Sequence, residues 1–265
     1  MEKINIENVD KRIDEKIENG YELDLGQIID NSFEIFKKIV WTVGLGYFLV
    51  TVFMLTIAVL GMYFLDPSQL DYVKEIRQDP SFLENNPEIM GYYLGVIIVV
   101  GAIFVPLNAG FLNICHLAKI NQQFSVLNIF DYYKSKYAKD LIIGTLLLTI
   151  FSTIIITLLD FANLKLVGFV IQISISLFTI LFMPLIIYGN QSFSNAIKKS
   201  IKLVVKYPFT ILGALVIGIV FAMLGLILCI GILFTMPYIN CIYYSLYESI
   251  VGFENKTVIE TSEEI

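Results

Sequence analysis

Charged residues are scarce in this 265-residue chain: they make up 16% of it, whereas hydrophobic residues make up 57%. A soluble domain usually carries about 25% charged residues, so the shortage argues against a soluble globular protein. The charges are missing in blocks, which leaves long uncharged apolar stretches rather than alternating faces. The composition therefore predicts an all-α, polytopic membrane protein.

Cysteine and histidine are also rare, with three cysteines and one histidine in the chain. The spacing of Cys115, Cys229 and Cys241 suits neither a disulfide framework nor a zinc site, and we interpret them as small apolar core residues. His116 has no acidic residue or second histidine close in sequence, so we predict no metal and no cofactor. With a net charge of −6, the chain offers no basic face to nucleic acid.

Acidic residues are missing from the middle of every long apolar stretch; Asp160 and Glu248 lie only at the ends. A transporter driven by protons or sodium would therefore lack its commonest coupling group. The chain also has no phosphate-binding loop, zinc-protease pair or nucleophile elbow. We predict that the protein is not an enzyme and has no catalytic residue.

The long apolar stretches match the roughly 20 residues that a spanning helix needs. We predict six transmembrane helices, arranged as three hairpins in one membrane domain over 23–252. The predicted spans are about 39–65, 90–115, 141–160, 165–188, 208–228 and 230–247. The last two come from one uncharged run, which we divide by a tight turn near Gly225 to Gly231.

Basic residues alternate between the two sides that these spans define. Six lie before the first span, four in 117–140, four in 190–207 and one in the tail 253–265, whereas the alternate connections carry three. The side with more lysine and arginine is normally cytoplasmic, so both termini are predicted to face the cytoplasm. The first 38 residues are polar and contain no signal-peptide pattern, so we expect the first span to remain as an anchor.

An amphipathic helix is predicted before each hairpin. In the third, Ile197, Ile201 and Val204 share one helical face and oppose a row of lysines. These helices either lie in the cytoplasmic headgroup layer or simply extend the spans that follow them. The lysines predicted to face headgroups are Lys37, Lys38, Lys134, Lys139, Lys198, Lys199, Lys202 and Lys206.

Residues 1–22 form an acidic cytoplasmic extension in which Ile6, Val9, Ile13 and Ile17 line one side of a short helix. We expect this helix to be solvated. The alternatives are that it packs back on the cytoplasmic face or binds a protein partner.

Each second helix of a hairpin contains a proline in apolar surroundings, with polar residues nearby. A proline frees a carbonyl one turn before it, and neighbouring amides can satisfy the loosened backbone. This interpretation predicts packed kinks. The alternative is a polar cavity among kinked spans 2, 4 and 6, as at transporter sites. The residues concerned are Pro106, Asn108, Asn113, Gln172, Pro184, Asn190, Pro237 and Asn240.

Span 5 carries Ala214, Gly218 and Ala222 at intervals of four. Small residues on one face let helices approach closely. They therefore predict either a helix contact inside the bundle or a dimer contact.

Three segments resemble a broad group of bacterial membrane proteins: 23–33, reading LDLGQIIDNSF; 194–200, reading SNAIKKS; and 237–247 with its proline and late tyrosine. The group includes the YciC-like inner-membrane proteins and the membrane domain of some glycerophosphodiester phosphodiesterases. The resemblance implies a multi-pass protein of a bacterial inner membrane. It implies no catalytic residue, because the phosphodiesterase activity belongs to a separate soluble domain.

Together these patterns predict an integral inner-membrane protein with a non-enzymatic accessory or envelope-maintenance role, acting through lipid or protein contacts. The alternative is a small-molecule or lipid transporter with its site among the kinked spans. The predicted partner is the lipid bilayer, with a protein partner at the N-terminal helix as a further candidate.

Overall fold

A computed structural model describes residues 6–64, 67–79, 81–228 and 231–253, and the all-α class is confirmed. Cys229 lies outside the described residues. The helices, of which η1 and η2 are 3₁₀ helices, are α1 (Ile6–Asn19), α2 (Leu25–Tyr63), α3 (Pro67–Gln78), α4 (Ser81–Asn85), α5 (Pro87–Lys119), η1 (Val126–Lys134), α6 (Ala138–Phe161), α7 (Lys165–Phe178), α8 (Phe182–Ile187), α9 (Phe193–Val204), α10 (Pro208–Leu224), η2 (Gly225–Leu228), α11 (Gly231–Thr235) and α12 (Pro237–Ile250).

Five segments in the described part of the chain are long and apolar enough to cross a membrane. They are Leu25–Gly61, Pro87–Lys119, Ala138–Phe161, Lys165–Ile187 and Pro208–Ile227. Five of the six predicted spans therefore have a matching segment.

The sixth predicted span, 230–247, is not one helix, and this prediction needs correction. The segment divides at Met236 into α11 and α12. Pro237 has no N–H to bond the Leu233 carbonyl, and its ring clashes with that carbonyl, so the regular helical hydrogen bonding is interrupted here. The 14 residues of α12 reach only about 21 Å, short of the ~30 Å hydrocarbon core. Most of α12 is buried within the protein.

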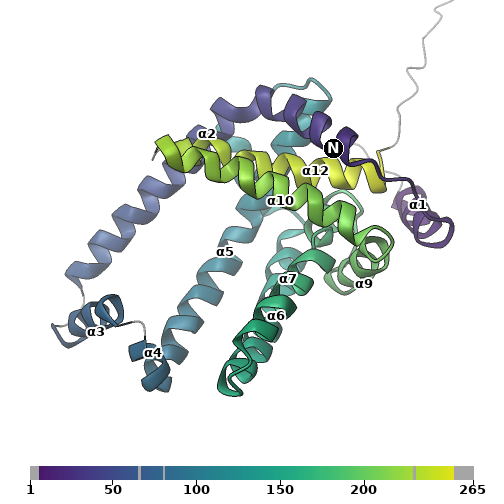
Figure 1. Ribbon diagram of the computed structural model, residues 1–265. Helices are drawn as coiled ribbons and strands as arrows, with labels where there is room; N and C mark the ends of the chain where they lie inside the picture. The colour runs from purple at the N-terminus through teal and green to yellow at the C-terminus, as the bar shows by residue number, and fades with distance from the viewer. Residues whose placement is uncertain (1–5, 65–66, 80, 229–230, 254–265) are drawn as a thin grey trace, which may run out of the picture.

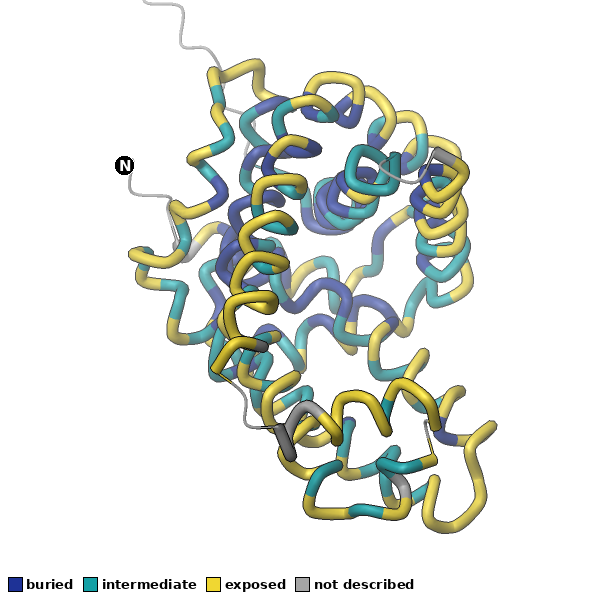
Figure 2. Tube along the Cα trace, turned by 90° about the vertical axis from the view of Figure 1, so that its left-hand side faces the viewer, coloured by how far each residue is buried: buried dark blue, intermediate teal, exposed yellow. Residues whose placement is uncertain are grey.

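The molecule has a tightly packed end and four apolar arms. We define the arms as residues 48–63 of α2, 90–103 of α5, 147–161 of α6 and 165–173 of α7. The arms expose side chains such as Phe53, Val96, Phe151 and Phe169, each more than half exposed. In Figure 1 the arms extend downward, and in Figure 2 the lower part is mostly exposed while the buried segments gather above. The connection of α3 and α4 lies at the far end from α1 (Figure 1).

The first half of α2 belongs to the packed end. The Asp24 side chain accepts a hydrogen bond from the Gln27 backbone N–H at 2.7 Å and so caps the helix. Helical spacings of seven and four then bury Ile28, Ile35 and Ile39 on one face. The first amphipathic stretch is thus continuous with its span, whereas the second and third form the separate helices η1 and α9.

The segment after Lys206 packs along this amphipathic half of α2 rather than along the α2 arm. The Phe36 ring lies 5.3 Å from Phe221 and 5.5 Å from Tyr238, centre to centre. Ala214, Gly218 and Ala222 are buried on the inner face of α10, where a Cβ on Gly218 would lie 3.3 Å from Ile242 Cγ1. Gly218 therefore serves a contact inside the bundle.

The three prolines affect their helices differently. α5 runs through Pro106, and the hydroxyl of Tyr133 on η1 donates to the nearby Ile103 carbonyl at 2.9 Å. Before Pro184 the helix stops at Phe178 and restarts at Phe182. Ser200 of α9 forms hydrogen bonds with the backbone at this interruption. Its hydroxyl donates to the Phe178 carbonyl at 2.7 Å and accepts from the Leu181 N–H at 3.2 Å. Hydroxyl groups of other helices thus bond the backbone near Pro106 and Pro184.

Replacing Ser200 with alanine is expected to destabilise the fold. The side chain is fully buried, so the substitution leaves the Phe178 carbonyl and Leu181 N–H without this partner. An unsatisfied buried polar group costs roughly 1–3 kcal/mol. We expect a lower thermal midpoint for Ser200→Ala in detergent, measured by size-exclusion chromatography after heating.

Ser174→Ala is the matched control, because among the described residues the Ser174 hydroxyl bonds just the Val170 carbonyl of its own helix. Equal midpoints for the two variants would contradict the assigned role of Ser200.

Candidate functional site

A cavity of about 270 Å³ lies at the junction of the packed end and the arms. Its lining residues come from α2, α5, α8, α12 and the break before α12: Tyr47, Asn108, Leu112, Met183, Met236, Ile239, Asn240 and Tyr243. The Asn240 amide donates to the Tyr47 hydroxyl at 3.0 Å. The structure thus brings together Asn108 and Asn240, two of the amides singled out in the sequence.

The helix interruptions help to shape this cavity. Met183 follows the break at 179–181, and Met236 is the break before α12. The ring of Tyr47, another lining residue, stacks on Phe111 with centroids 4.2 Å apart and planes 11° apart. This stacking fixes the direction of the Tyr47 hydroxyl.

The remaining polar candidates do not line the cavity. Gln172 is exposed on the α7 arm, and Asn113 is half-buried on α5. Asn190 adopts a left-handed conformation with φ of 49° after α8 and accepts a hydrogen bond from Lys136 at 2.6 Å. Pro106, Pro184 and Pro237 are buried residues of their helices. Gln172 is therefore not part of the cavity that Asn108 and Asn240 line.

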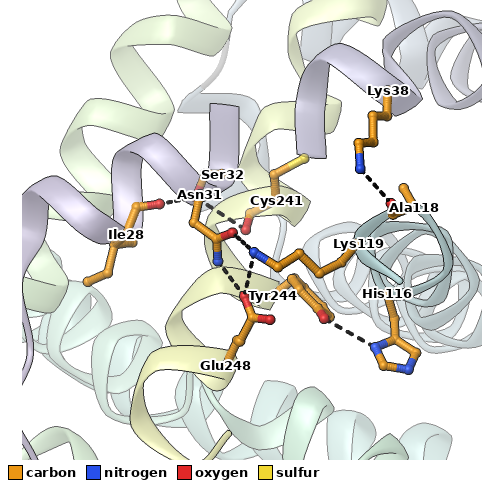
Figure 3. A network of polar contacts seen from close by, with 10 residues as sticks. All are labelled: Ile28, Asn31, Ser32, Lys38, His116, Ala118, Lys119, Cys241, Tyr244 and Glu248. Atoms are coloured by element: carbon orange, nitrogen blue, oxygen red, sulfur yellow. Dashed lines mark hydrogen bonds and ion pairs between the residues drawn. The ribbon is translucent and has the colours of Figure 1, made fainter. Parts of the chain in front are cut away.

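A polar cluster that the sequence did not reveal joins α2, α5 and α12 (Figure 3). Lys119 donates to the Asn31 side-chain oxygen, and the Asn31 amide donates to Glu248. Lys119 Nζ also lies 3.5 Å from Glu248 Oε2. Glu248 and Asn31 are 217 positions apart in the chain, so sequence spacing could not identify this contact.

Further contacts surround this cluster. The Ser32 hydroxyl bonds the Ile28 carbonyl at 2.6 Å and the Cys241 carbonyl at 3.3 Å. His116 Nδ1 lies 3.1 Å from the Tyr244 hydroxyl (Figure 3). Cys115 and Cys241 are fully buried free thiols with their sulfurs 4.0 Å apart. These contacts bind the same three helices together.

The N-terminal helix α1 packs on α9, so the expectation of a solvated helix is wrong. Val9 and Ile13 are buried in the common core. Lys199 of α9 lies 2.6 Å from Asp10 and 2.7 Å from Asp14. Gln191 donates to Asp10 at 2.8 Å. Packing back on the protein was one of the two alternatives considered for this helix.

This ion pair shifts two pKa values outside the spans. The hydrogen bond from Lys199 holds the pKa of Asp10 below its ordinary value. Burial would lower the pKa of Lys199, but its hydrogen bonds to Asp10 and Asp14 outweigh burial and raise that pKa. Both shifts favour the charged pair that joins α1 to α9.

Six of the eight lysines predicted to face headgroups are exposed, and Lys199 and Lys206 are partly buried. Lys199 forms its ion pairs with α1. Lys38 donates to the Ala118 carbonyl at 3.1 Å and to the Asn121 side chain at 2.7 Å. Lys37 lies over the Phe33 ring at 4.9 Å, and Lys206 is partly buried. The exposed ones are Lys37, Lys38, Lys134, Lys139, Lys198 and Lys202.

The described residues contain no group of three or more His, Cys, Asp or Glu side chains that would hold a metal ion. The helices and their exposed arms define the chain as an all-α protein suited to multiple membrane passes. No family model, curated protein or solved structure matches the chain.

Breaking the Lys119–Glu248 pair is expected to lower the free energy of unfolding. The Lys119 and Glu248 side chains are 33% and 24% exposed, so the pair is intermediate between a surface and a buried ion pair. Lys119→Met or Glu248→Gln should therefore lower the free energy of unfolding by about 1–3 kcal/mol, more than the loss of a surface pair and less than that of a buried pair. The double variant should lose less than the sum of the single losses, since both remove one interaction. Unfolding in detergent with increasing denaturant measures all three variants.

Lys74→Met is the control, because its ion pair with Asp71 is 67% exposed on both sides and should contribute little. Strict additivity of the Lys119 and Glu248 effects would contradict the coupling.

The contact between α1 and α9 is expected to depend on pH in a defined window. The lowered pKa of Asp10 makes its contribution complete above about pH 4 and lost as pH falls through the lowered value. The raised pKa of Lys199 makes its contribution complete below about pH 10 and lost as pH rises through the raised value. A spin label on Glu18→Cys, in protein with its native cysteines replaced, should be immobile at pH 7 and more mobile at pH 3.

Lys199→Met should increase the label mobility already at pH 7, whereas Lys202→Met, an exposed residue of the same helix, should not. Unchanged mobility in Lys199→Met would show that the apolar contacts alone hold α1.

Proposed function

We propose that this protein is a non-enzymatic accessory protein of a bacterial inner membrane, acting through lipid and protein contacts. The main observation behind this proposal is the contrast between the packed end and the four arms, whose large apolar side chains are exposed. Exposed apolar surface of this extent is stable when hydrocarbon or a partner covers it. The resemblance of 23–33, 194–200 and 237–247 to YciC-like proteins supports the same assignment.

In this proposal, α1, α9 and η1 face the cytoplasm, and α3 and α4 face the other side. Two observations support it: the lysine-rich connections contrast with lysine-poor ones, and α3 lies at the opposite end from α1 (Figure 1). Lys198 and Lys202 are exposed on α9, and so is the apolar side chain of Ile201, whereas Leu203 and Val204 are buried. Such a helix suits contact with anionic headgroups at the membrane surface.

The proposed absence of catalysis rests on the sequence, which has no recognisable catalytic motif. A transporter of small molecules or lipids is the second candidate. It is favoured by the cavity and by the helix interruptions near Pro184 and Pro237, because Met183 and Met236 beside them line the cavity.

Anionic-lipid retention tests the leading proposal. The protein is purified from native membranes, and its bound lipids and proteins are identified by mass spectrometry. Replacing both Lys198 and Lys202 with glutamine should lower the retained anionic lipid by more than tenfold, at roughly 1 kcal/mol per lysine. The control is the pair Lys74→Gln and Arg77→Gln on α3, which should leave retention unchanged.

Equal retention in the two paired variants would count against lipid contact through α9. Reporter fusions that place 66–89 and 190–207 in the same compartment would overturn the topology. Solute flux in proteoliposomes that disappears in a folded Asn240→Leu variant would favour the transporter instead.

A further inference from the structure

The cavity at the junction of α2, α5, α8 and α12 has polar groups but no charged side chain in its wall. Asn108 and Tyr243 make no side-chain hydrogen bond with any described residue, although both line the cavity. The Tyr47 hydroxyl accepts from Asn240, which leaves its own proton free to donate. One amide and two hydroxyls therefore remain available to a bound molecule.

The chemistry of the wall restricts that molecule. Transferring an ion into a cavity without an opposite charge is strongly unfavourable, so the occupant should be neutral. Leu112, Met183, Met236 and Ile239 supply apolar surface, and the flexible methionines can adapt to different shapes. The volume of about 270 Å³ lies just below the usual 300–1,000 Å³ of ligand pockets, so it fits a small polar group with a short apolar segment.

The position of the cavity suggests how the molecule enters. Tyr47 directly precedes the α2 arm, and Asn108 follows the α5 arm within five residues. The two arms diverge away from this point in Figure 1. If hydrocarbon surrounds the arms, an apolar tail can lie against them while its polar group reaches the amide and hydroxyls.

We infer that this cavity binds the hydroxyl- or ester-bearing polar group of a neutral amphiphile. The Asn108 amide and the Tyr243 and Tyr47 hydroxyls form its hydrogen bonds, and the methionines contact its first apolar carbons. The inference rests on the proposed membrane location but requires neither transport nor the lysine contacts of α9. A membrane glyceride and a free lipophilic alcohol offer the same chemistry.

Photocrosslinking of the full-length protein in nanodiscs tests this inference. Three diazirine probes are compared: a monoacylglycerol, a medium-chain alcohol, and a fatty acid of the same chain length as the monoacylglycerol. Peptide mapping should place labels from a neutral probe near Tyr47, Met183 or Met236. Labelling of these residues by the monoacylglycerol would identify a membrane glyceride as the ligand. Labelling by the alcohol but not by the monoacylglycerol would identify a free lipophilic alcohol. The ionised fatty acid should label the cavity at least fivefold less.

Asn108→Leu should lower cavity labelling about fivefold, which corresponds to the loss of one net hydrogen bond. Gln172→Leu is the matched control, because it removes an exposed amide on the α7 arm and should leave labelling unchanged. Tyr243→Phe, which removes one hydroxyl at nearly constant volume, replaces Asn108→Leu if that variant does not elute as a single species.

Three results would overturn the inference: neutral labels spread evenly over the arms, equal labelling by the fatty acid, or equal labelling in both the Asn108 and Gln172 variants. The lysine test above is independent, since these probes carry no anionic headgroup except in the control. Cavity labelling with unchanged anionic-lipid retention would therefore reject the α9 proposal alone.

Discussion

The contact of α12 with both α2 and α5 is the interaction on which the rest of the fold depends. Aromatic rings of α2, α10 and α12 pack together around Tyr238, and the Asn31–Lys119–Glu248 cluster adds hydrogen bonds at the other end of α12. In hydrocarbon, apolar side chains alone give no preference for helix over lipid. Close packing and polar contacts must therefore supply the specificity of this junction.

The helix interruptions near Pro184 and Pro237 create contacts between helices and help to form the cavity. A continuous helix would satisfy its backbone internally and would present its side chains to lipid. The interruption before Pro184 instead needs partners from elsewhere, and the Ser200 hydroxyl supplies two contacts from α9. This requirement ties α9 to the spans, so an amphipathic helix becomes part of the packed end. The same two interruptions place Met183 and Met236 in the wall of the cavity.

The α1–α9 pair shows a second way in which the packed end is built. Val9 and Ile13 supply burial, while Lys199 faces two carboxylates of α1. The acidic extension thus uses one of the lysines expected at the headgroups and leaves Lys198 and Lys202 exposed on the same helix. The charge of α9 available to a membrane surface is correspondingly smaller than its sequence suggests.

The sequence by itself determined the helical class, the membrane character and the positions of five long apolar segments, because these depend on local composition over about 20 residues. It also singled out Asn108 and Asn240, but could not show that they share a cavity while Gln172 faces outward. Only the tertiary structure decided that 231–247 is divided and that α12 is mostly buried. It also decided that Ser200 bonds the backbone at the break before Pro184 and that Glu248 lies beside Lys119. The physical reason is that each of these features is a contact between residues far apart in the chain, and no local pattern contains the partner.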